Sequence, residues 1–263
     1  MQALETDAIR LTVVMPVYNE GDTIRSTLLE ASLKIAKTCD NVTFAVSEDG
    51  SRDNTKEALI SIASEMPNLS VHLGPNRKGY PLAARDAILA VDGRSDCILF
   101  MDSDGQYDPS DFRVLWRELK ETNADMVVGT RMNRAETPLR VFLSTGLRLL
   151  ERLLFRTKQK DVTSAFRLMR IGPAQSTARK VKYSKYNFWL EFTAIASLSG
   201  HRIREVPVVY RARTGVSRVY SGSKILQAAV QELTTLMRIW RDFRLKRHRR
   251  ETDWNLARVP ASQ

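Results

Sequence analysis

Apolar runs alternate with stretches of helical periodicity along roughly the first half of the chain. The first run, residues 11–17, is rich in β-branched side chains, and apolar residues then recur at spacings of three and four from Ile24 to Ile35. The same alternation returns, with apolar runs at residues 42–50, 70–74 and 97–105. Because strands that alternate with helices form parallel sheets covered by helices, the pattern predicts an α/β fold with a doubly wound, mostly parallel sheet.

The second half of the chain has a less regular pattern. A further strand is expected at residues 125–131, followed by an irregular stretch from Leu139 to Phe155. Later segments favour a helix at residues 188–200 and a strand at residues 204–212. The α/β pattern therefore continues beyond the first four alternations, with weaker local signals.

The last long segment, from Lys224 to about Arg247, has the pattern of an amphipathic helix. Its apolar stripe is formed by Leu226, Val230, Leu233, Met237 and Trp240, and basic residues crowd its end at Arg238, Arg241, Arg244, Lys246, Arg247, Arg249 and Arg250. We therefore expect residues 1–220 to form the main domain and residues 221–263 to form this helix with a basic tail. The helix is expected to contact an anionic membrane surface or a membrane protein; packing on its own domain or in a coiled coil is the alternative.

Polar side chains follow three of the predicted strands at the point where each strand ends. They lie at Tyr18–Glu20, Glu48–Asp53 and Asp102–Gln106. The carboxyl ends of parallel strands meet at one edge of a sheet, where open α/β sheets bind their ligands. We therefore expect the three clusters to line a single ligand site.

Asp102 and Asp104 stand two residues apart directly after an apolar strand, and Gln106 follows after another two. Semi-buried carboxylates without a partner are unfavourable, and oxygen ligands at this spacing suit a hard divalent cation. The sequence thus predicts a Mg²⁺ or Mn²⁺ site that also holds a diphosphate and stabilises it as a leaving group. The alternative is an acidic turn without a ligand, because Asp, Ser and Gly are common turn residues.

Asp49 follows an apolar strand at the same predicted edge, where its carboxylate can accept hydrogen bonds from a base or a ribose. The segment around it, SEDGSRDNT, also fits a tight turn in which Asp53 or Asn54 caps the next helix. An EF-hand is excluded because neither acidic loop has the required pattern ending in glutamate. A dinucleotide-binding Rossmann site is excluded because the first strand–helix turn, YNEGD, contains no GxGxxG.

The ordered set VVMPVYNE, EDGSRDNT, PNRKG, FMDSDGQYDP and VGTR resembles family 2 glycosyltransferases, and most of all the dolichol-phosphate mannose synthases and related polyprenyl-phosphate glycosyltransferases. The resemblance covers residues 11–220 and implies a GT-A fold, a catalytic main domain and inversion at the anomeric carbon. It implies that the nucleotide sugar is contacted by Pro16, Tyr18, Glu20, Asp49 and Asp102. It also implies that Asp102, Asp104 and Gln106 hold the metal and the diphosphate, the same side chains that the spacing argument selects.

Polyprenyl-phosphate members of the family also bind the acceptor phosphate with basic residues. The resemblance implies this role for Arg131 in VGTR and for Arg140, which precedes Ser144 by four residues. The GxSK loop of the family is replaced by GVSR, which puts Arg218 after Ser217 where a lysine is usual. Arginine keeps the charge and adds a planar fork for phosphate oxygens, so we expect all four of Arg131, Arg140, Ser217 and Arg218 to bind phosphate. The alternative for each arginine is an exposed surface charge.

The nature of the acceptor decides whether the reaction needs a base. A phosphate oxygen is already anionic at neutral pH, so positioning and leaving-group stabilisation suffice. A sugar hydroxyl must lose a proton, and Glu191 in NFWLEFT falls where inverting relatives place an acidic base. The main expectation is transfer from GDP-mannose or a UDP-sugar to a polyprenyl phosphate, and the alternative is a glycan or glycolipid hydroxyl as acceptor. A nucleotidyltransferase is the second alternative, because it shares paired aspartates and a metal, although YNEGD replaces its usual glycine- and basic-rich loop.

Charge and cysteine content narrow the class of protein further. The formal net charge of +11 implies an anionic partner, but the chain has no zinc-ligand spacing and no recognisable nucleic-acid-binding module, so no nucleic acid is expected. Cys39 and Cys97 are too few and too far apart in sequence to suggest a disulfide framework or a cysteine metal site, which fits the cytoplasm. Without a signal peptide or a spanning apolar run, we expect a cytoplasmic enzyme, peripheral at the cytoplasmic face of a membrane.

Overall fold

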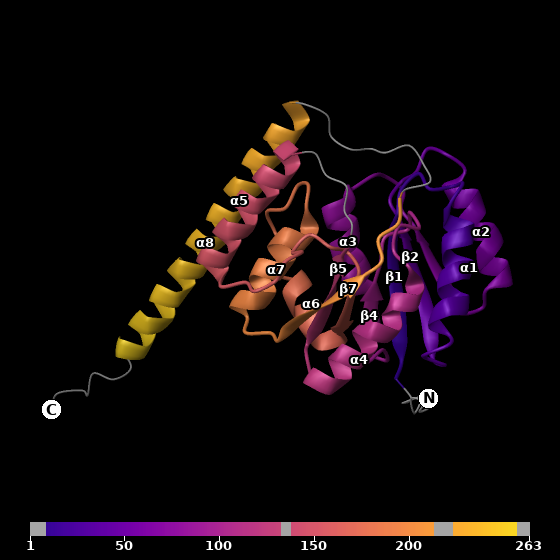
Figure 1. The fold of residues 1–263 in the computed structure, drawn as a ribbon, viewed down its shortest axis with the longest axis horizontal. Coiled ribbons are helices and arrows are strands. Elements are labelled where there is room, and N and C mark those ends of the chain that lie inside the picture. The colour runs from indigo at the N-terminus through magenta and orange to yellow at the C-terminus, as the bar shows by residue number, and fades with distance from the viewer. Residues whose placement is uncertain (1–8, 133–137, 213–222, 257–263) are drawn as a thin grey trace.

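The described part of the chain, residues 9–132, 138–212 and 223–256 of the computed structural model, contains a seven-stranded sheet of order β3-β2-β1-β4-β6-β5-β7 (Figure 1). The strands are Leu11–Val17 (β1), Val42–Glu48 (β2), Leu69–Leu73 (β3), Cys97–Phe100 (β4), Met126–Arg131 (β5), Arg167–Arg170 (β6) and Ile203–Val208 (β7). Among them, β6 runs antiparallel to β4 and β5, and the other pairs are parallel. The predicted α/β fold with a mostly parallel sheet is confirmed.

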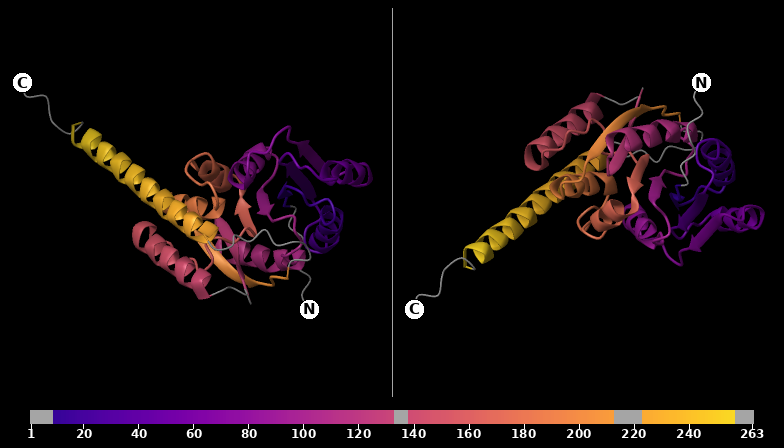
Figure 2. Two further views of the ribbon diagram at one scale, coloured as in Figure 1. Left: turned by 90° about the horizontal axis from the view of Figure 1, so that it is seen from above. Right: turned by 90° about the horizontal axis from the view of Figure 1, so that it is seen from below.

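Helices flank this sheet, as the three views show (Figures 1 and 2). They are Ile24–Ile35 (α1), Thr55–Glu65 (α2), Tyr80–Ala90 (α3), the short 3₁₀ helix Pro109–Asp111, Phe112–Thr122 (α4), Pro138–Phe155 (α5), Ile171–Ala178 (α6), Phe188–Leu198 (α7) and Ser223–Leu256 (α8). Local chemistry explains several of their ends. Pro81 lies in the first turn of α3, where a missing N–H costs nothing, and Asn123 ends α4 in the left-handed region, at φ +50°.

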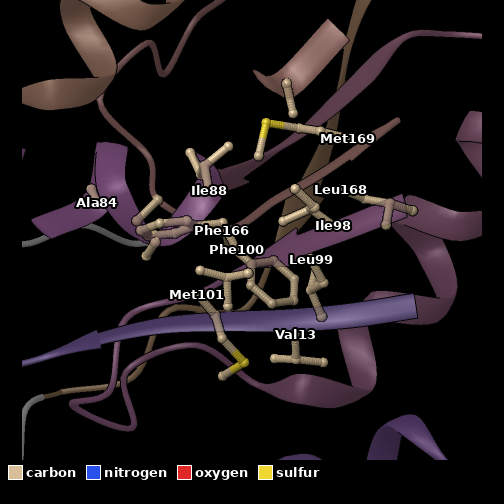
Figure 3. Packing of buried hydrophobic residues seen from close by; sticks show 14 of the residues in the cluster. Val13, Ala84, Ile88, Ile98, Leu99, Phe100, Met101, Phe166, Leu168 and Met169 are labelled. Atoms are coloured by element: carbon tan, nitrogen blue, oxygen red, sulfur yellow. The ribbon is translucent and has the colours of Figure 1, made fainter. Parts of the chain in front are cut away.

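The core is centred on β1 and β4, whose side chains are almost completely buried. Figure 3 shows Val13 of β1 close to Leu99 of β4, while Ala84 of α3 lies among side chains that also come from β4 and β6. A strand buried on both faces needs a continuous apolar run instead of an alternating one, and residues 11–17 supply such a run. The packed core therefore fixes the carboxyl ends of β1 and β4 next to each other.

The strand β6 is not evident from the sequence pattern. It has four residues, and it begins and ends with arginine. Arg167 is nevertheless fully buried, because its guanidinium donates hydrogen bonds to the carbonyl oxygens of Ser164 (2.7 Å) and Val162 (2.7 Å) and to the hydroxyl of Thr193 (2.8 Å). A charge can occupy the interior only when its donors are satisfied in this way, and residues distant in sequence supply part of that partnership.

The interpretation of Leu139 to Phe155 as irregular is wrong, because this segment belongs to α5, Pro138–Phe155. The apolar pattern misleads here. Glu151 is completely buried, whereas Leu149 and Leu153 are 67% and 78% exposed. Other apolar residues of α5, Leu147, Leu150, Leu154 and Phe155, do pack on the core, so this helix has apolar side chains on both its buried and its exposed sides.

The helix expected from Lys224 to about Arg247 is present as the longer α8, Ser223–Leu256. It packs against α5 and α7 and then extends beyond the rest of the molecule (Figures 1 and 2). Leu236 and Ile239 hold it to the core. Three members of the predicted stripe do not pack there, since Val230, Leu233 and Met237 are 53%, 43% and 45% exposed.

Candidate active site

A pocket of about 270 Å³ opens at the carboxyl ends of β1, β2 and β4. It is lined by Pro16, Val17, Tyr18, Glu20, Asp49, Arg77, Tyr80, Ala83, Asp102, Ser103 and Asp104. The parallel pairing of β1 with both β2 and β4 brings these residues together from distant parts of the sequence. The structure thus gathers at one edge every residue expected to contact the nucleotide sugar, and we call this cavity the acidic pocket.

The loop after β4 turns so that Asp102 and Asp104 both line the acidic pocket. Between them, the hydroxyl of Ser103 donates to the carbonyl oxygen of Pro16 (3.2 Å), which fastens the loop to the end of β1. Gly105 follows with a φ of +72°, a conformation that costs glycine little. Ser103 is buried at the wall of the acidic pocket, and its hydrogen bond to β1 holds the bend that carries the two carboxylates.

Asp49 holds the neighbouring turn between β3 and α3. One carboxylate oxygen accepts from the backbone N–H of Lys78 (2.7 Å) and the other from the backbone N–H of Gly79 (2.9 Å). The turn lies so close that a Cβ on Gly50 would come within 2.5 Å of the backbone nitrogen of Arg77. Asp49 therefore shapes the wall of the acidic pocket as well as lining it.

In the same segment, SEDGSRDNT, the expected helix cap is also present, and it is formed by Asp53. Its carboxylate accepts from the backbone N–H of Thr55 (3.1 Å) at the start of α2. Asn54 stands at the cap position without a side-chain hydrogen bond to the helix. Asp53 therefore caps the start of α2, while Asp49 lines the acidic pocket.

Arg77 and Tyr80 also line the acidic pocket, and neither is expected from the sequence to be a site residue. The guanidinium of Arg77 lies over the ring of Tyr18, 4.1 Å from its centre, and the hydroxyl of Tyr80 donates to Asp102 (2.9 Å). Burial and the charge of Asp102 raise the pKa of Tyr80 well above its usual value, so this hydroxyl keeps its proton. Both residues belong to the PNRKGY turn, and the sequence of this turn does not indicate which groups Arg77 and Tyr80 face.

Gln106, the third expected metal ligand, does not line the acidic pocket. Its side-chain oxygen accepts from the hydroxyl of Tyr210 (2.9 Å), and its nitrogen donates to the carbonyl oxygen of Arg211 (3.1 Å). These contacts tie the loop after β4 to the segment after β7. In the described parts of the chain, no group of three His, Cys, Asp or Glu side chains is placed to hold a metal ion.

A second pocket, of about 230 Å³, opens beside the carboxyl end of β5. We call it the basic pocket; it is lined by Thr130, Arg131, Leu147, Arg148, Lys160, Asp161, Val162, Thr163, Leu190 and Glu232. Of the expected phosphate ligands, it contains Arg131. Arg140 lies in α5, with its side chain outside the described part, and Ser217 and Arg218 also lie outside the described residues.

Arg131 has a carboxylate partner that the sequence did not reveal. Its guanidinium makes two hydrogen bonds with Asp161, both 2.8 Å long, and a third with the hydroxyl of Thr163 (2.7 Å). Its side chain is 9% exposed, and it lies over the ring of Tyr210. Because Asp161 neutralises Arg131, the net positive charge of the basic pocket comes from other residues.

Arg148 and Lys160 supply that charge. Arg148 donates to the backbone oxygen of Lys160 (3.1 Å), so α5 and the loop before β6 meet at the pocket. Opposite them stands Glu232 of α8, whose pKa burial raises to about 7. Near neutral pH this carboxyl group is therefore partly protonated, and it offsets less of the positive charge than an ordinary glutamate would.

Glu191 lines neither pocket. It is completely buried in α7, and its carboxylate accepts from the backbone N–H groups of Lys182 (2.8 Å), Tyr183 (2.9 Å) and Ser184 (2.6 Å). Both oxygens are engaged in holding this loop. The geometry therefore favours a structural role over the role of a base that accepts a proton from a substrate.

The comparisons with known proteins agree with this architecture. The model of the family described as glycosyl transferase family 2 matches residues 12–178. Dolichyl-phosphate beta-glucosyltransferase ALG5A of Trichomonas vaginalis is 28% identical over 228 residues, which cover 82% of this chain and 70% of that protein. The dolichyl-phosphate hexose transferase of Haloferax volcanii is 28% identical over 219 residues, covering 80% of this chain and 86% of that protein.

A solved structure shares the fold. Glucosyl-3-phosphoglycerate synthase from Mycobacterium tuberculosis, in complex with Mn²⁺, UDP-glucose and phosphoglyceric acid, superimposes with a TM-score of 0.64 at 19% identity. The alignment covers 88% of this chain and 80% of that one. The sheet and its helices are thus those of GT-A glycosyltransferases.

The structural role of Glu191 leads to a stability prediction. Glu191→Gln keeps the size of the side chain but replaces one acceptor oxygen by an N–H₂ group, which leaves a buried backbone donor without a partner. We expect the free energy of unfolding to fall by about 1 to 3 kcal/mol, measured by urea denaturation, with turnover of the folded protein largely retained. Unchanged stability together with lost turnover would instead support the base role.

Proposed function

The chain belongs to glycosyltransferase family 2, and we propose that it transfers a sugar from a nucleoside diphosphate donor to the phosphate of a polyprenyl lipid. The observation that carries this proposal is the pairing of an acidic pocket with a basic pocket on the two sides of α7. Trp189 of α7 reaches Tyr80 in the acidic pocket, and the next residue, Leu190, lines the basic pocket. A donor and an anionic acceptor can therefore approach each other from pockets of opposite character.

The donor belongs to the acidic pocket. Pro16, Tyr18, Glu20 and Asp49 lie on its β1 and β2 side, and Asp102 with Asp104 lies at β4. The nucleoside is accordingly assigned to the first group and the diphosphate to the second. The mycobacterial neighbour, solved with UDP-glucose, supports this class of donor, and GDP-mannose or a UDP-sugar fits it equally.

Asp102 and Asp104 fit a divalent cation, Mg²⁺ or Mn²⁺. Among the described residues no third acidic or histidine side chain joins Asp102 and Asp104 in a group that could hold a metal, which matches cations that complete their coordination with substrate phosphates and water. The side chain of Gln106 is bonded to Tyr210 and Arg211 outside the acidic pocket, and it would have to turn away from them to join these two carboxylates. When bound, the cation neutralises the charge that develops on the departing diphosphate.

The acceptor phosphate is assigned to the basic pocket. Arg131 lines it with its Nε and Nη2 donors bonded to Asp161, and Arg148 and Lys160 supply net charge. Arg140, Ser217 and Arg218 are further proposed ligands from motif matches. A phosphate oxygen needs no base, which agrees with the engaged carboxylate of Glu191. Two dolichyl-phosphate glycosyltransferases among the relatives support this acceptor over a sugar hydroxyl.

Removal of one acidic ligand tests the donor site. We expect Asp104→Asn to lower turnover by at least about a hundredfold, because less charge remains to hold the cation against the diphosphate. Excess chelator should abolish the activity of the wild type, and Mn²⁺ should restore it. The measurement is release of nucleoside diphosphate; release of pyrophosphate would instead identify a nucleotidyltransferase. Full activity of the variant, or of the wild type in chelator, contradicts the proposed site.

Charge removal in the basic pocket tests the acceptor site. Lys160→Ala and Arg148→Ala should each raise the Michaelis constant for a short polyprenyl phosphate about tenfold, the size expected when a hydrogen bond to a charged group is lost. The Michaelis constant for the nucleotide sugar should stay within about twofold. Lys158→Ala is the matched control, because this exposed lysine lies two residues away and does not line the pocket. Equal effects on donor and acceptor would argue against a phosphate in the basic pocket.

We further propose that α8, with α5 beside it, rests on the cytoplasmic face of an anionic membrane or on a membrane protein. The exposed leucines of α5 and the exposed stripe Val230, Leu233 and Met237 lie on neighbouring helices. Exposed Arg238 and Arg241 add charge that anionic headgroups attract, about 1 kcal/mol each near the surface. Within the described residues, no helix has both the length and the apolar character of a membrane span.

Flotation with anionic vesicles tests this surface. Leu233 and Met237 are exposed, so replacing both by serine should leave the fold intact yet lower the vesicle-bound fraction about tenfold. The matched control replaces the exposed Leu33 and Ile60 of α1 and α2, at the other end of the molecule (Figure 1). Truncation before Arg238 is a poorer test, because it removes Ile239 from the core. Equal flotation of both variants and wild type would refute a role for the stripe.

A further inference from the structure

The hydroxyl of Tyr80 connects the metal-binding edge to the core of the protein. It donates a hydrogen bond to Oδ1 of Asp102 (2.9 Å) and accepts one from Nε1 of Trp189 (2.9 Å). Asp102 is at the end of β4, Tyr80 begins α3, and Trp189 is in α7. Three separate elements thus meet in one chain of hydrogen bonds that ends on a carboxylate of the acidic pocket.

Trp189 is held from several sides and has little freedom to move. It is 1% exposed, and its ring meets the edges of three phenylalanines, with the ring of Phe100 4.6 Å away and those of Phe188 and Phe192 at 4.8 and 5.2 Å. The guanidinium of Arg167 covers its face at 4.4 Å. A side chain packed in this way keeps its rotamer, so its N–H points steadily at the Tyr80 hydroxyl.

The first turn of α7 is fixed as well. The side chain of Asn187 accepts from the backbone N–H of Trp189 (3.2 Å), which caps the helix. One turn further, Glu191 secures the loop before the helix through three backbone hydrogen bonds. Tyr80 is therefore hydrogen-bonded to Trp189, which lies in the fixed first turn of α7.

The orientation of Asp102 is what this support controls. The terminal torsion of an aspartate is soft, so a carboxylate at a pocket wall can rotate unless a donor fixes one oxygen. Hydrogen bonds from outer residues that fix metal-binding side chains typically change metal affinity by about 10- to 100-fold. A rigid donor on Oδ1 would leave Oδ2 oriented for a cation.

We propose that Tyr80 and Trp189 are a positioning pair that orients the Asp102 carboxylate for the divalent cation, with Trp189 acting through Tyr80. The pair rests on the metal site of the proposed function and is independent of the acceptor. It makes the buried aromatic cluster around α7 part of the metal site, although Trp189 itself does not line the acidic pocket.

Mn²⁺ alone, titrated into the full chain and followed by the electron paramagnetic resonance of the free ion, tests the pair. Tyr80→Phe keeps the ring and removes the hydroxyl, and we expect it to weaken Mn²⁺ binding about tenfold. Tyr107→Phe is the matched control: this tyrosine is buried, whereas Tyr80 is partly buried, and the Tyr107 hydroxyl meets Ser164 and the backbone N–H of Ala165 instead of a pocket carboxylate. The control should bind Mn²⁺ within about twofold of the wild type.

A double-mutant cycle tests whether Trp189 acts on Asp102 through the hydroxyl of Tyr80. Trp189→Phe should weaken Mn²⁺ binding in the wild-type background and have no further effect in Tyr80→Phe, because its influence passes through the missing hydroxyl. Thermal unfolding of each variant verifies that it is folded. If the two substitutions are additive, or if Tyr80→Phe leaves Mn²⁺ binding unchanged, the positioning role is overturned while the proposed function stands.

Tyr80 could also contact the donor directly, and nucleotide binding distinguishes this role from positioning of Asp102. In chelator, UDP and GDP should bind Tyr80→Phe and wild type equally, because the pair acts on the cation site. Weaker nucleotide binding in chelator, with unchanged Mn²⁺ affinity, would make Tyr80 a donor ligand and overturn the proposal. A wild type that binds no Mn²⁺ would overturn the metal site itself and, with it, this pair.

Discussion

Negative charge gathered at the carboxyl edge of the sheet is the constraint on which the site depends. Parallel pairing of β1 with β2 and β4 forces Glu20, Asp49, Asp102 and Asp104 toward one pocket, where like charges repel unless they are compensated. The protein compensates each locally by a different donor. The hydroxyl of Thr23 donates to Glu20 (3.0 Å), backbone N–H groups donate to Asp49, the Tyr80 hydroxyl donates to Asp102, and the backbone N–H of Gln106 donates to Asp104 (3.2 Å). Neutral donors of this kind hold the carboxylates in place without removing the charge that a cation needs.

The two pockets differ in the sign of the charge that their side chains leave uncompensated. The acidic pocket keeps its carboxylates, whereas the basic pocket pairs Arg131 with Asp161 and leaves Arg148 and Lys160 to set its sign. Between the pockets stands α7, an almost entirely buried helix whose only acidic residue, Glu191, is used to hold its own approach loop. Consecutive residues of this helix reach the two pockets, Trp189 through Tyr80 and Leu190 directly, so α7 joins the sites proposed for donor and acceptor.

Helices α5 and α8 each leave apolar side chains exposed beside a buried apolar face. Glu151 is buried, and burial raises its pKa to about 8, while leucines on the same helix face outward. On α8 the buried face is built from Leu236 and Ile239, and a second apolar stripe remains exposed beside it. Apolar surface left outside by two adjacent helices is unusual for a face that meets only water, which is why a lipid or protein surface is proposed for it.

The sequence by itself determined the elements whose signal is local. Continuous apolar runs marked the buried parallel strands, and the polar residues that end them, Asp49, Asp102 and Asp104, predicted one ligand edge because parallel strands end together. Tertiary structure alone decided what depends on partners distant in sequence. Arg167 of β6 is buried with the hydroxyl of Thr193 in α7 among its acceptors. Arg131 is neutralised by a carboxylate thirty residues away, and the carboxylate of Glu191 is engaged by the loop before α7. Periodicity records which side of an element is buried, but it carries no information on which distant group will satisfy a buried charge, and that satisfaction fixes the role of each residue.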